Sequence, residues 1–423
     1  MKRRKQSRRW RGKKYAPVMI GMLVLLMNLA DLKISNLISG SIICQAAERQ
    51  SENTETENNS EGTEKEKIMQ TEASTVSDIL EELDLSRVQR MLDQMLGEES
   101  FSMKDMLDGL IKGEKVLSED TVQEMVHSFL FSGLEKEKSL LIKILLLILL
   151  SAVLANFADV FESGQIGDIC FYIVYLLLFI LLMDSFSSVT RSVQQTITWM
   201  AEFMRGLAPA YFLTISIAAG SSTAAVFYEG VLILTWLIQE VILNLLFPGA
   251  CLYVLISLIN NLSKEEMLGK MAELLDTAVS WGLKTLLGMV VGLQVVRGLI
   301  APVMDTLKRS ALGKAAGALP GVGNAVNMVT ELVLTSAVLV RNCLGVVILF
   351  AFVAAGAGPV IHYGILSLLY RFLAAQPVSE KRIVDSLATM GEGCALLLRI
   401  LFTAEILCIL DFVILMTGIG GSG

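Results

Sequence analysis

The chain has 423 residues, 53% of them hydrophobic, and its mean hydropathy is +0.60. The net charge of −7 combines a basic start, in which nine of the first fourteen residues are Lys or Arg, with a Glu-rich segment over residues 48–84. These values exclude an ordinary soluble domain, and the long apolar runs with only seven Pro disfavour a β-barrel. The sequence predicts an all-α, polytopic helical membrane protein.

The first expected element is a signal sequence over residues 1–46, with a basic stretch followed by an apolar run at 16–30. Cys44 and Ala46 are small enough for peptidase cleavage, and an uncleaved signal anchor is the alternative because the segment before them is long. In both cases the chain from Glu48 onward is expected outside the cytoplasm. Residues 47–75 are rich in Glu, Asn, Ser and Thr, which predicts a disordered acidic linker.

Residues 76–138 are predicted to form an extracytoplasmic region of amphipathic helices. One apolar face is formed by Leu85, Val88, Leu92, Met95 and Leu96. A second face lies within 122–130, after a capping-box pair at Thr121 and Glu124. The two faces either pack on each other or offer a docking surface to a partner.

Residues 139–423 are predicted to form a multi-span membrane domain with about seven spans. Nine apolar segments are candidates: 140–157, 169–183, 207–219, 227–247, 249–262, 283–303, 326–340, 344–361 and 395–417. Segments 207–219 and 249–262 are short, so one or both are expected to be re-entrant or half-helices. Amphipathic stretches at 187–205, 263–280 and 304–318 are expected along the interface. The charges of the loops do not fix the orientation in the membrane.

A weak internal repeat relates residues 252–284 to residues 361–399. Both units read as an apolar helix, a charged joint, an amphipathic helix and an apolar segment entered by a basic residue, Lys284 or Arg399. The pattern favours two related halves, an arrangement common in transporters.

No catalytic constellation is recognisable in the sequence. The six cysteines lack metal-ligand spacing, and the glycines at 321 and 323 follow no strand and lack the lysine of a phosphate-binding loop. We therefore expect no enzymatic activity, no cofactor and no metal.

Candidate functional residues are the polar groups inside apolar segments, because an ionised side chain in hydrocarbon must be paired or hydrated. Glu240 and Asn244 share a helix face with Trp236 and Pro248, and Pro248 is expected to end that helix. Glu240 is expected to pair with a basic residue such as Arg341, to line a hydrated path, or to lie at the interface.

Six further positions complete the candidate set. Glu331 lies within an apolar segment, where it is expected to take part in pairing or to line a path. Gly288 and Gly292 form a small-xxx-small pair, which predicts a close helix–helix contact. Lys284, Arg297 and Arg399 are expected near helix ends, with their charged groups extended toward the interface.

Several C-terminal motifs, in this order and spacing, resemble the stage III sporulation protein AE family of endospore-forming bacteria. They are AAGALPGVG at 315–323, Glu331, VRNCLGV at 340–346, LYRFLAA at 369–375, PVSEKRI at 377–383 and a terminal apolar helix. The resemblance covers roughly residues 78–420 and is densest over 283–417.

The resemblance implies an integral-membrane component of the channel or secretion-like complex that joins mother cell and forespore. It implies a multi-pass protein of the outer, mother-cell-derived forespore membrane. The implied partners are membrane lipids, ring-forming stage III sporulation proteins, a mother-cell ATPase and a forespore-side partner, but not nucleic acid. An independent secondary transporter and a non-conducting scaffold of the complex are the alternatives.

Overall fold

The computed structural model describes residues 85–97, 100–112, 138–139, 142–146, 149–150, 153, 164–219, 221–262, 268–316, 323–375 and 381–417. Almost all of them belong to one unit, formed by Glu72–Leu107 and Gln123–Gly423. Of the other unit, Met1–Thr71 and Asp108–Val122, only residues 108–112 are described. The predicted signal sequence, linker and second amphipathic face therefore lie outside the described residues.

Every regular element in these ranges is helical, which confirms the predicted fold class. In chain order the elements are α6 (Ser86–Leu96), α7 (Met103–Ile111), α9 (Gly164–Ala219), α10 (Ser221–Val241), the π-helix η2 (Ile242–Leu246), α11 (Phe247–Leu262), α12 (Gly269–Ala316), α13 (Gly323–Ala374) and α14 (Lys381–Thr417). Five segments of the described chain are long and apolar enough to cross a membrane: Tyr172–Leu207, Glu229–Asn261, Gly269–Leu293, Ser336–Ala374 and Lys381–Val413.

The predicted boundaries between apolar segments were often wrong, because several polar joints continue as helix. Segments 169–183 and 207–219 both lie in α9, together with the stretch 187–205 that was expected to be a separate interfacial helix. Likewise 326–340 and 344–361 both lie in α13, and 263–280, 283–303 and 304–318 contribute to α12. Most of segment 140–157 lies outside the described residues.

The predicted half-helix at 249–262 is instead the end of a continuous rod formed by α10, η2 and α11. Pro248 was expected to end the helix, but it lies within the first turn of α11 and the helix continues. A proline ring clashes with the carbonyl of the residue four positions earlier, here Asn244, and cannot donate to it. The π-helical turn Ile242–Leu246 lies at that position and accommodates the proline without a break.

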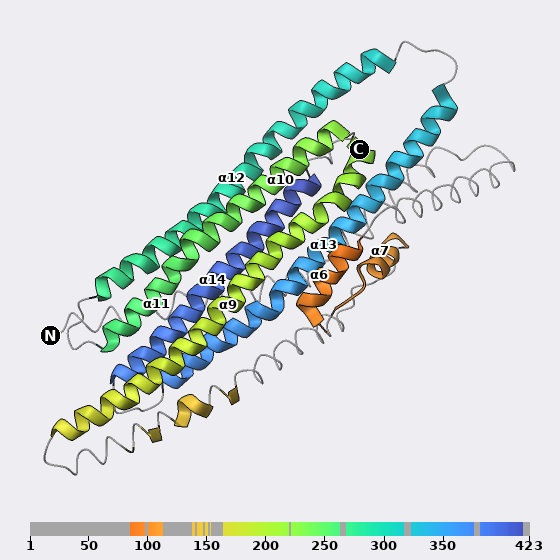
Figure 1. The fold of residues 1–423 in the computed structure, drawn as a ribbon. Coiled ribbons are helices and arrows are strands. Elements are labelled where there is room, and N and C mark those ends of the chain that lie inside the picture. The colour runs from red at the N-terminus through yellow and green to blue at the C-terminus, as the bar shows by residue number, and fades with distance from the viewer. Residues whose placement is uncertain are drawn as a thin grey trace. The chain divides into compact units, whose positions relative to one another are not determined.

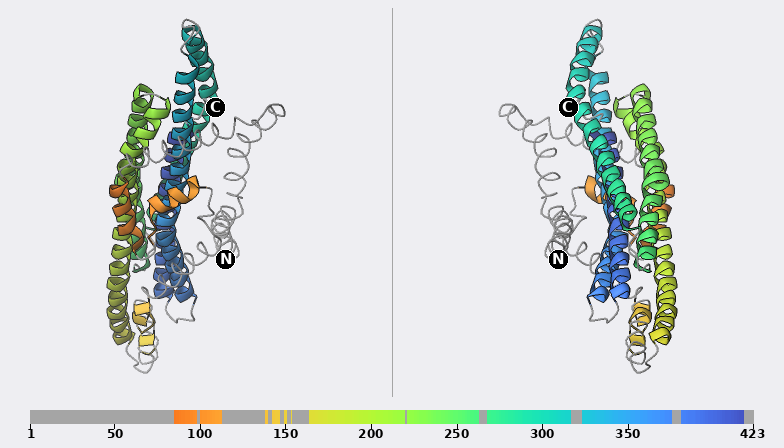
Figure 2. Two further views of the ribbon diagram at one scale, coloured as in Figure 1. Left: turned by 90° about the vertical axis from the view of Figure 1, so that its right-hand side faces the viewer. Right: turned by 90° about the vertical axis from the view of Figure 1, so that its left-hand side faces the viewer.

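The long helices run side by side, with α13 and α14 packed on each other and against α9 (Figures 1 and 2). α11 pairs with α12, and each half of the predicted repeat is a helical hairpin, α11–α12 or α13–α14. Apolar side chains of α13 and α14 are largely buried, including Phe352 and Phe412. These two helices therefore form the centre of the described structure.

Glycines allow the closest approaches between the helices. A Cβ atom on Gly282 or Gly393 would overlap a methyl group of Leu246 or Val254, respectively. On Gly249 it would lie 3.0 Å from Val279 Cγ2. Close packing through small residues is the expected way for helices to associate in lipid.

The amphipathic face predicted from Leu85 to Leu96 is confirmed in α6, where Val88, Leu92 and Leu96 are buried. α6 packs against α9 and α13. The indole Nε1 of Trp199 donates a 2.9 Å hydrogen bond to the carbonyl of Met91. This face is therefore covered by the membrane helices of the same chain.

Hydrogen bonds stabilise the turn that follows α6. Gln89 Nε2 donates to Asp93 Oδ1 at 2.8 Å, and Gln89 Oε1 accepts from the amide of Met103 at 2.8 Å. Hydrogen bonds from Ser100 and then Gln89 lower the pKa of the exposed Asp93 carboxyl below its ordinary value of 3.8.

Candidate functional site

The two predicted candidates on the rod of α10, η2 and α11 are brought together by the structure. Asn244 Nδ2 donates a 2.7 Å hydrogen bond to Glu240 Oε1, and both side chains are exposed. Arg341, the expected partner of Glu240, lies elsewhere: it is buried in α13, and its Nη2 donates to Asn342 Oδ1 at 3.3 Å. In this chain Glu240 is therefore paired with a neutral side chain one turn away.

Glu331 lies in α13, and its side chain is outside the described residues. Gly288 and Gly292 lie in α12, but the helix contact expected there is not formed within the described chain. A Cβ atom on either glycine would meet nothing within 4 Å. The close contact of α12 is instead formed earlier in the helix, at Gly282.

Arg399 was expected near a helix end, but it lies in the middle of α14. Its Nη2 lies 3.6 Å from Asp276 Oδ1 of α12, with the two side chains 28% and 36% exposed. Its Nη1 also donates to Ser280 Oγ at 3.1 Å. An arginine within an apolar helix is thus stabilised by a carboxylate and a hydroxyl of the neighbouring helix.

Arg399 belongs to a row of polar side chains along α14 that bond to neighbouring helices, which we call the α14 polar row. Its other members are Ser386, Thr389, Glu392 and Asp411. Ser386 shares a 3.0 Å hydrogen bond with Tyr175 of α9, and Asp411 accepts one of 2.6 Å from Thr235 of α10. Two members bond to α11: Thr389 accepts from Asn261 at 2.9 Å, and Glu392 accepts from Tyr253 at 2.9 Å. The row connects α14 to four helices and explains how so many polar groups are tolerated inside an apolar segment.

Glu405, also on α14, is buried against α13. A Cβ atom on Gly356 would overlap the Glu405 carboxylate, so the absence of a side chain at Gly356 makes room for it. Glu405 and Asp411 were not among the candidates predicted from the sequence. Their position inside the apolar segment 395–417, the same criterion that selected Glu240, would have identified them.

A second set of polar groups lies on α9, where the exposed residues change character along the helix. Near its start they are large and apolar: Tyr172, Ile173, Leu176, Leu177 and Ile180. From 184 to 205 every exposed residue is polar: Asp184, Ser187, Ser188, Arg191, Ser192, Gln194, Gln195, Glu202 and Arg205. We call this second stretch the α9 polar face.

A surface of this kind is costly in lipid. Transfer of one Asp or Arg to the centre of a membrane helix costs about 2.5–3.5 kcal/mol on insertion scales. The α9 polar face carries two acidic and two basic residues, so its exposure to hydrocarbon would cost roughly 10 kcal/mol before the serines and glutamines are counted. The face therefore requires water or polar groups beside it.

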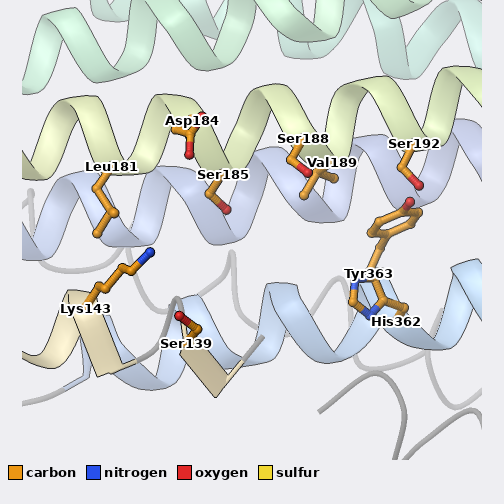
Figure 3. A pocket seen from close by; sticks show the side chains of 10 residues that line it. All are labelled: Ser139, Lys143, Leu181, Asp184, Ser185, Ser188, Val189, Ser192, His362 and Tyr363. Atoms are coloured by element: carbon orange, nitrogen blue, oxygen red, sulfur yellow. The ribbon is translucent and has the colours of Figure 1, made fainter. Parts of the chain in front are cut away.

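A polar cavity of about 440 Å³ opens on this face (Figure 3). α9 contributes Asp184, Ser185, Ser188 and Ser192, among others, and α13 contributes His362 and Tyr363. Ser139 and Lys143 line the opposite side, and the Lys143 side chain extends toward α9. The cavity thus combines a carboxylate, an ammonium group, an imidazole and several hydroxyls, a lining suited to water and small polar solutes.

A metal centre is not indicated in the described part of the chain, where no three His, Cys, Asp or Glu residues are grouped to hold an ion. Four cysteines have described side chains, Cys251, Cys343, Cys394 and Cys408, and they are free thiols at buried or half-buried positions. The polar sites of the described residues are therefore hydrogen-bonded rows and surfaces.

The fold and these sites define a helical integral-membrane protein with polar groups both between its helices and on one outer face. The family model of stage III sporulation protein AE matches residues 101–419, and the chain belongs to this family. Stage III sporulation protein AE of Bacillus subtilis (strain 168) is 23% identical over 319 residues, which cover 75% of this chain and 80% of that protein. No solved structure is significantly similar to the chain. The family membership supports a role in sporulation and confirms the resemblance described above.

Proposed function

We propose that this protein is an integral-membrane component of a channel or secretion-like complex that joins mother cell and forespore during endospore formation. The carrying observation is that a member of a sporulation family has a hydrophilic surface on a membrane helix, the α9 polar face. Such a surface is not stable in lipid on its own, but it suits a subunit of a larger assembly with a hydrated interior.

The proposed location is the outer forespore membrane. The proposed partners are ring-forming stage III sporulation proteins, a mother-cell ATPase and a forespore-side partner. We propose that this chain has no catalytic activity of its own, so that ATP hydrolysis by the partner supplies the energy. Its contribution is then a membrane-embedded surface and not a reaction.

An independent secondary transporter is the second candidate function. The two helical hairpins α11–α12 and α13–α14 favour it, because related halves are common in transporters. A non-conducting scaffold is the third candidate.

Affinity purification of the tagged protein from sporulating cells, after mild crosslinking, distinguishes these candidates. A complex component is recovered with other stage III sporulation proteins and the ATPase, and an untagged strain controls for carry-over. Purified protein in lipid vesicles is then assayed for solute uptake. If the protein is recovered without any such partner and takes up solute on its own, the transporter hypothesis is favoured over the complex.

A further inference from the structure

We propose that the α9 polar face, residues 184–205, forms part of the wall of a water-filled passage across the membrane. The ligand class is water with small hydrated solutes. The inference rests on the proposed function and deepens it, because it names the surface that the passage contacts. It also assigns a role to the cavity beside Asp184, which becomes a widening of the passage.

The first step concerns the depth of this face in the membrane. Ser185 of α9 shares a 2.7 Å hydrogen bond with Tyr370 of α13, and the rings of Phe203 and Phe352 lie 5.0 Å apart, edge to face. Residues 185–203 of α9 therefore run antiparallel to residues 352–370 of α13, which belong to the most apolar span of the described chain. At 1.5 Å per residue this stretch is roughly 27 Å long, close to the thickness of the hydrocarbon layer.

The second step is a comparison with the exposed face of α11. Hydrogen bonds from Tyr175 to the Leu258 carbonyl and from Arg205 to Gln239 place α9 beside the rod of α10, η2 and α11. The exposed residues of α11 with described side chains are Pro248, Leu252 and Ile259, all of them apolar. The exposed face of α11 is thus suited to lipid, although the rod also exposes the hydrogen-bonded pair Glu240 and Asn244 just before α11.

The third step concerns the charges of the face. Asp184 and Glu202 are balanced by Arg191 and Arg205, and Lys143 adds a positive charge at the cavity. Rings of a single sign select ions of the opposite sign. A mixed face such as this one solvates cations and anions alike, so the passage it lines does not discriminate strongly by charge.

The test is the water accessibility of single cysteines in membranes from sporulating cells. Cysteine replaces Ser188 or Gln195 on the α9 polar face, and Leu252 or Leu274 as controls, whose side chains are 49% and 68% exposed. α6 meets α9 at Trp199 and Gly206, and the side chains of Ser188 and Gln195 are exposed. A membrane-impermeant maleimide is applied, and total reactivity is measured after denaturation.

We expect the two α9 positions to react at least tenfold faster than the two controls. Equal, fast reaction at all four positions would place this region outside the bilayer and overturn the inference. Slow reaction at all four would show that lipid or protein covers the face, which also overturns it.

Two further controls keep the result interpretable. The substitutions are made both in a chain whose native cysteines are replaced and in the natural background, where the labelling of the parent protein is subtracted. Co-purification of partners is measured in the same membranes. Unreactive α9 positions with intact co-purification refute only the passage, whereas reactive positions with no partners refute the proposed complex.

Discussion

Gly393→Ala is expected to destabilise the protein, because Gly393 lies where α14, α11 and α9 meet. An added Cβ would overlap Cγ2 of Val254, and it would lie 3.4 Å from Cγ1 and 3.5 Å from Phe186 Cε2. Val254 and Phe186 are both buried. Valine is branched at Cβ and has few rotamers, so it cannot turn its methyl groups away.

The size of the effect follows from two opposing contributions. Overpacking a well-packed core by one methyl group costs about 1–3 kcal/mol. Alanine is favoured over glycine in a helix interior by roughly 0.5–1 kcal/mol. Because the rigid Val254 side chain cannot adapt, we expect a net loss of about 1–2 kcal/mol in the free energy of unfolding.

The measurement is unfolding of the purified protein in mild detergent by added dodecyl sulfate, followed by circular dichroism. Gly364→Ala is the matched control, since its added Cβ would lie 3.9 Å from Leu398 Cδ2, an ordinary contact. In a Val254→Ala background the overlap is removed, and Gly393→Ala should become nearly neutral. Equal stability of Gly393→Ala and Gly364→Ala would refute the packing described here.

Three further predictions concern polar groups. Arg399→Gln and Asp276→Asn should each lower the free energy of unfolding by about 0.5–2 kcal/mol. In the same unfolding assay the double variant should lose less than the sum of the two single losses. Strictly additive losses would show that the two side chains do not interact. Asp93 has a folded-state pKa below its ordinary value of 3.8, so its stabilisation is present above 3.8 and is lost as the pH falls through the folded-state pKa. At neutral pH, backbone hydrogen exchange in α6 should therefore be faster in Asp93→Asn than in the natural protein. This difference should shrink progressively below pH 3.8, and a difference that stays constant with pH would contradict the prediction. Glu240→Gln keeps an acceptor for Asn244, so protein abundance should be unchanged, and a fall in abundance would show that Glu240 has a basic partner in the assembly.

Much of the fold could be predicted from hydropathy and periodicity. The apolar segments predicted the membrane helices, and the spacing of Val88, Leu92 and Leu96 predicted the buried side of α6. The ends of the helices could not be predicted in the same way. Proline and polar joints usually interrupt helices, but Pro209 and Pro359 lie inside α9 and α13. Membrane helices tolerate an internal proline where the freed backbone groups find other partners.

The candidate sites were harder to predict because their partners are distant in sequence. Tyr175 and Ser386 are 211 residues apart, and no local pattern connects them. The spacing of Gly288 and Gly292 suggested a packing site, but helix rotation places the contact at Gly282. The α9 polar face has a visible sequence signal, since 184–205 contains four charged residues, and the signal was interpreted as an interfacial helix.

The two polar sets of the membrane region differ in how their hydrogen-bonding and charge requirements are met, and this difference predicts different roles. The α14 polar row bonds to side chains of neighbouring helices, as Arg399 does to Asp276, so changes there should alter stability first. The α9 polar face is exposed, and apart from Arg205, which donates to Gln239, its side chains gain little from the rest of the chain and depend on what lies outside it. Conservative changes on α9, such as Ser188→Ala, should therefore leave folding nearly unchanged and reveal the function of the assembly.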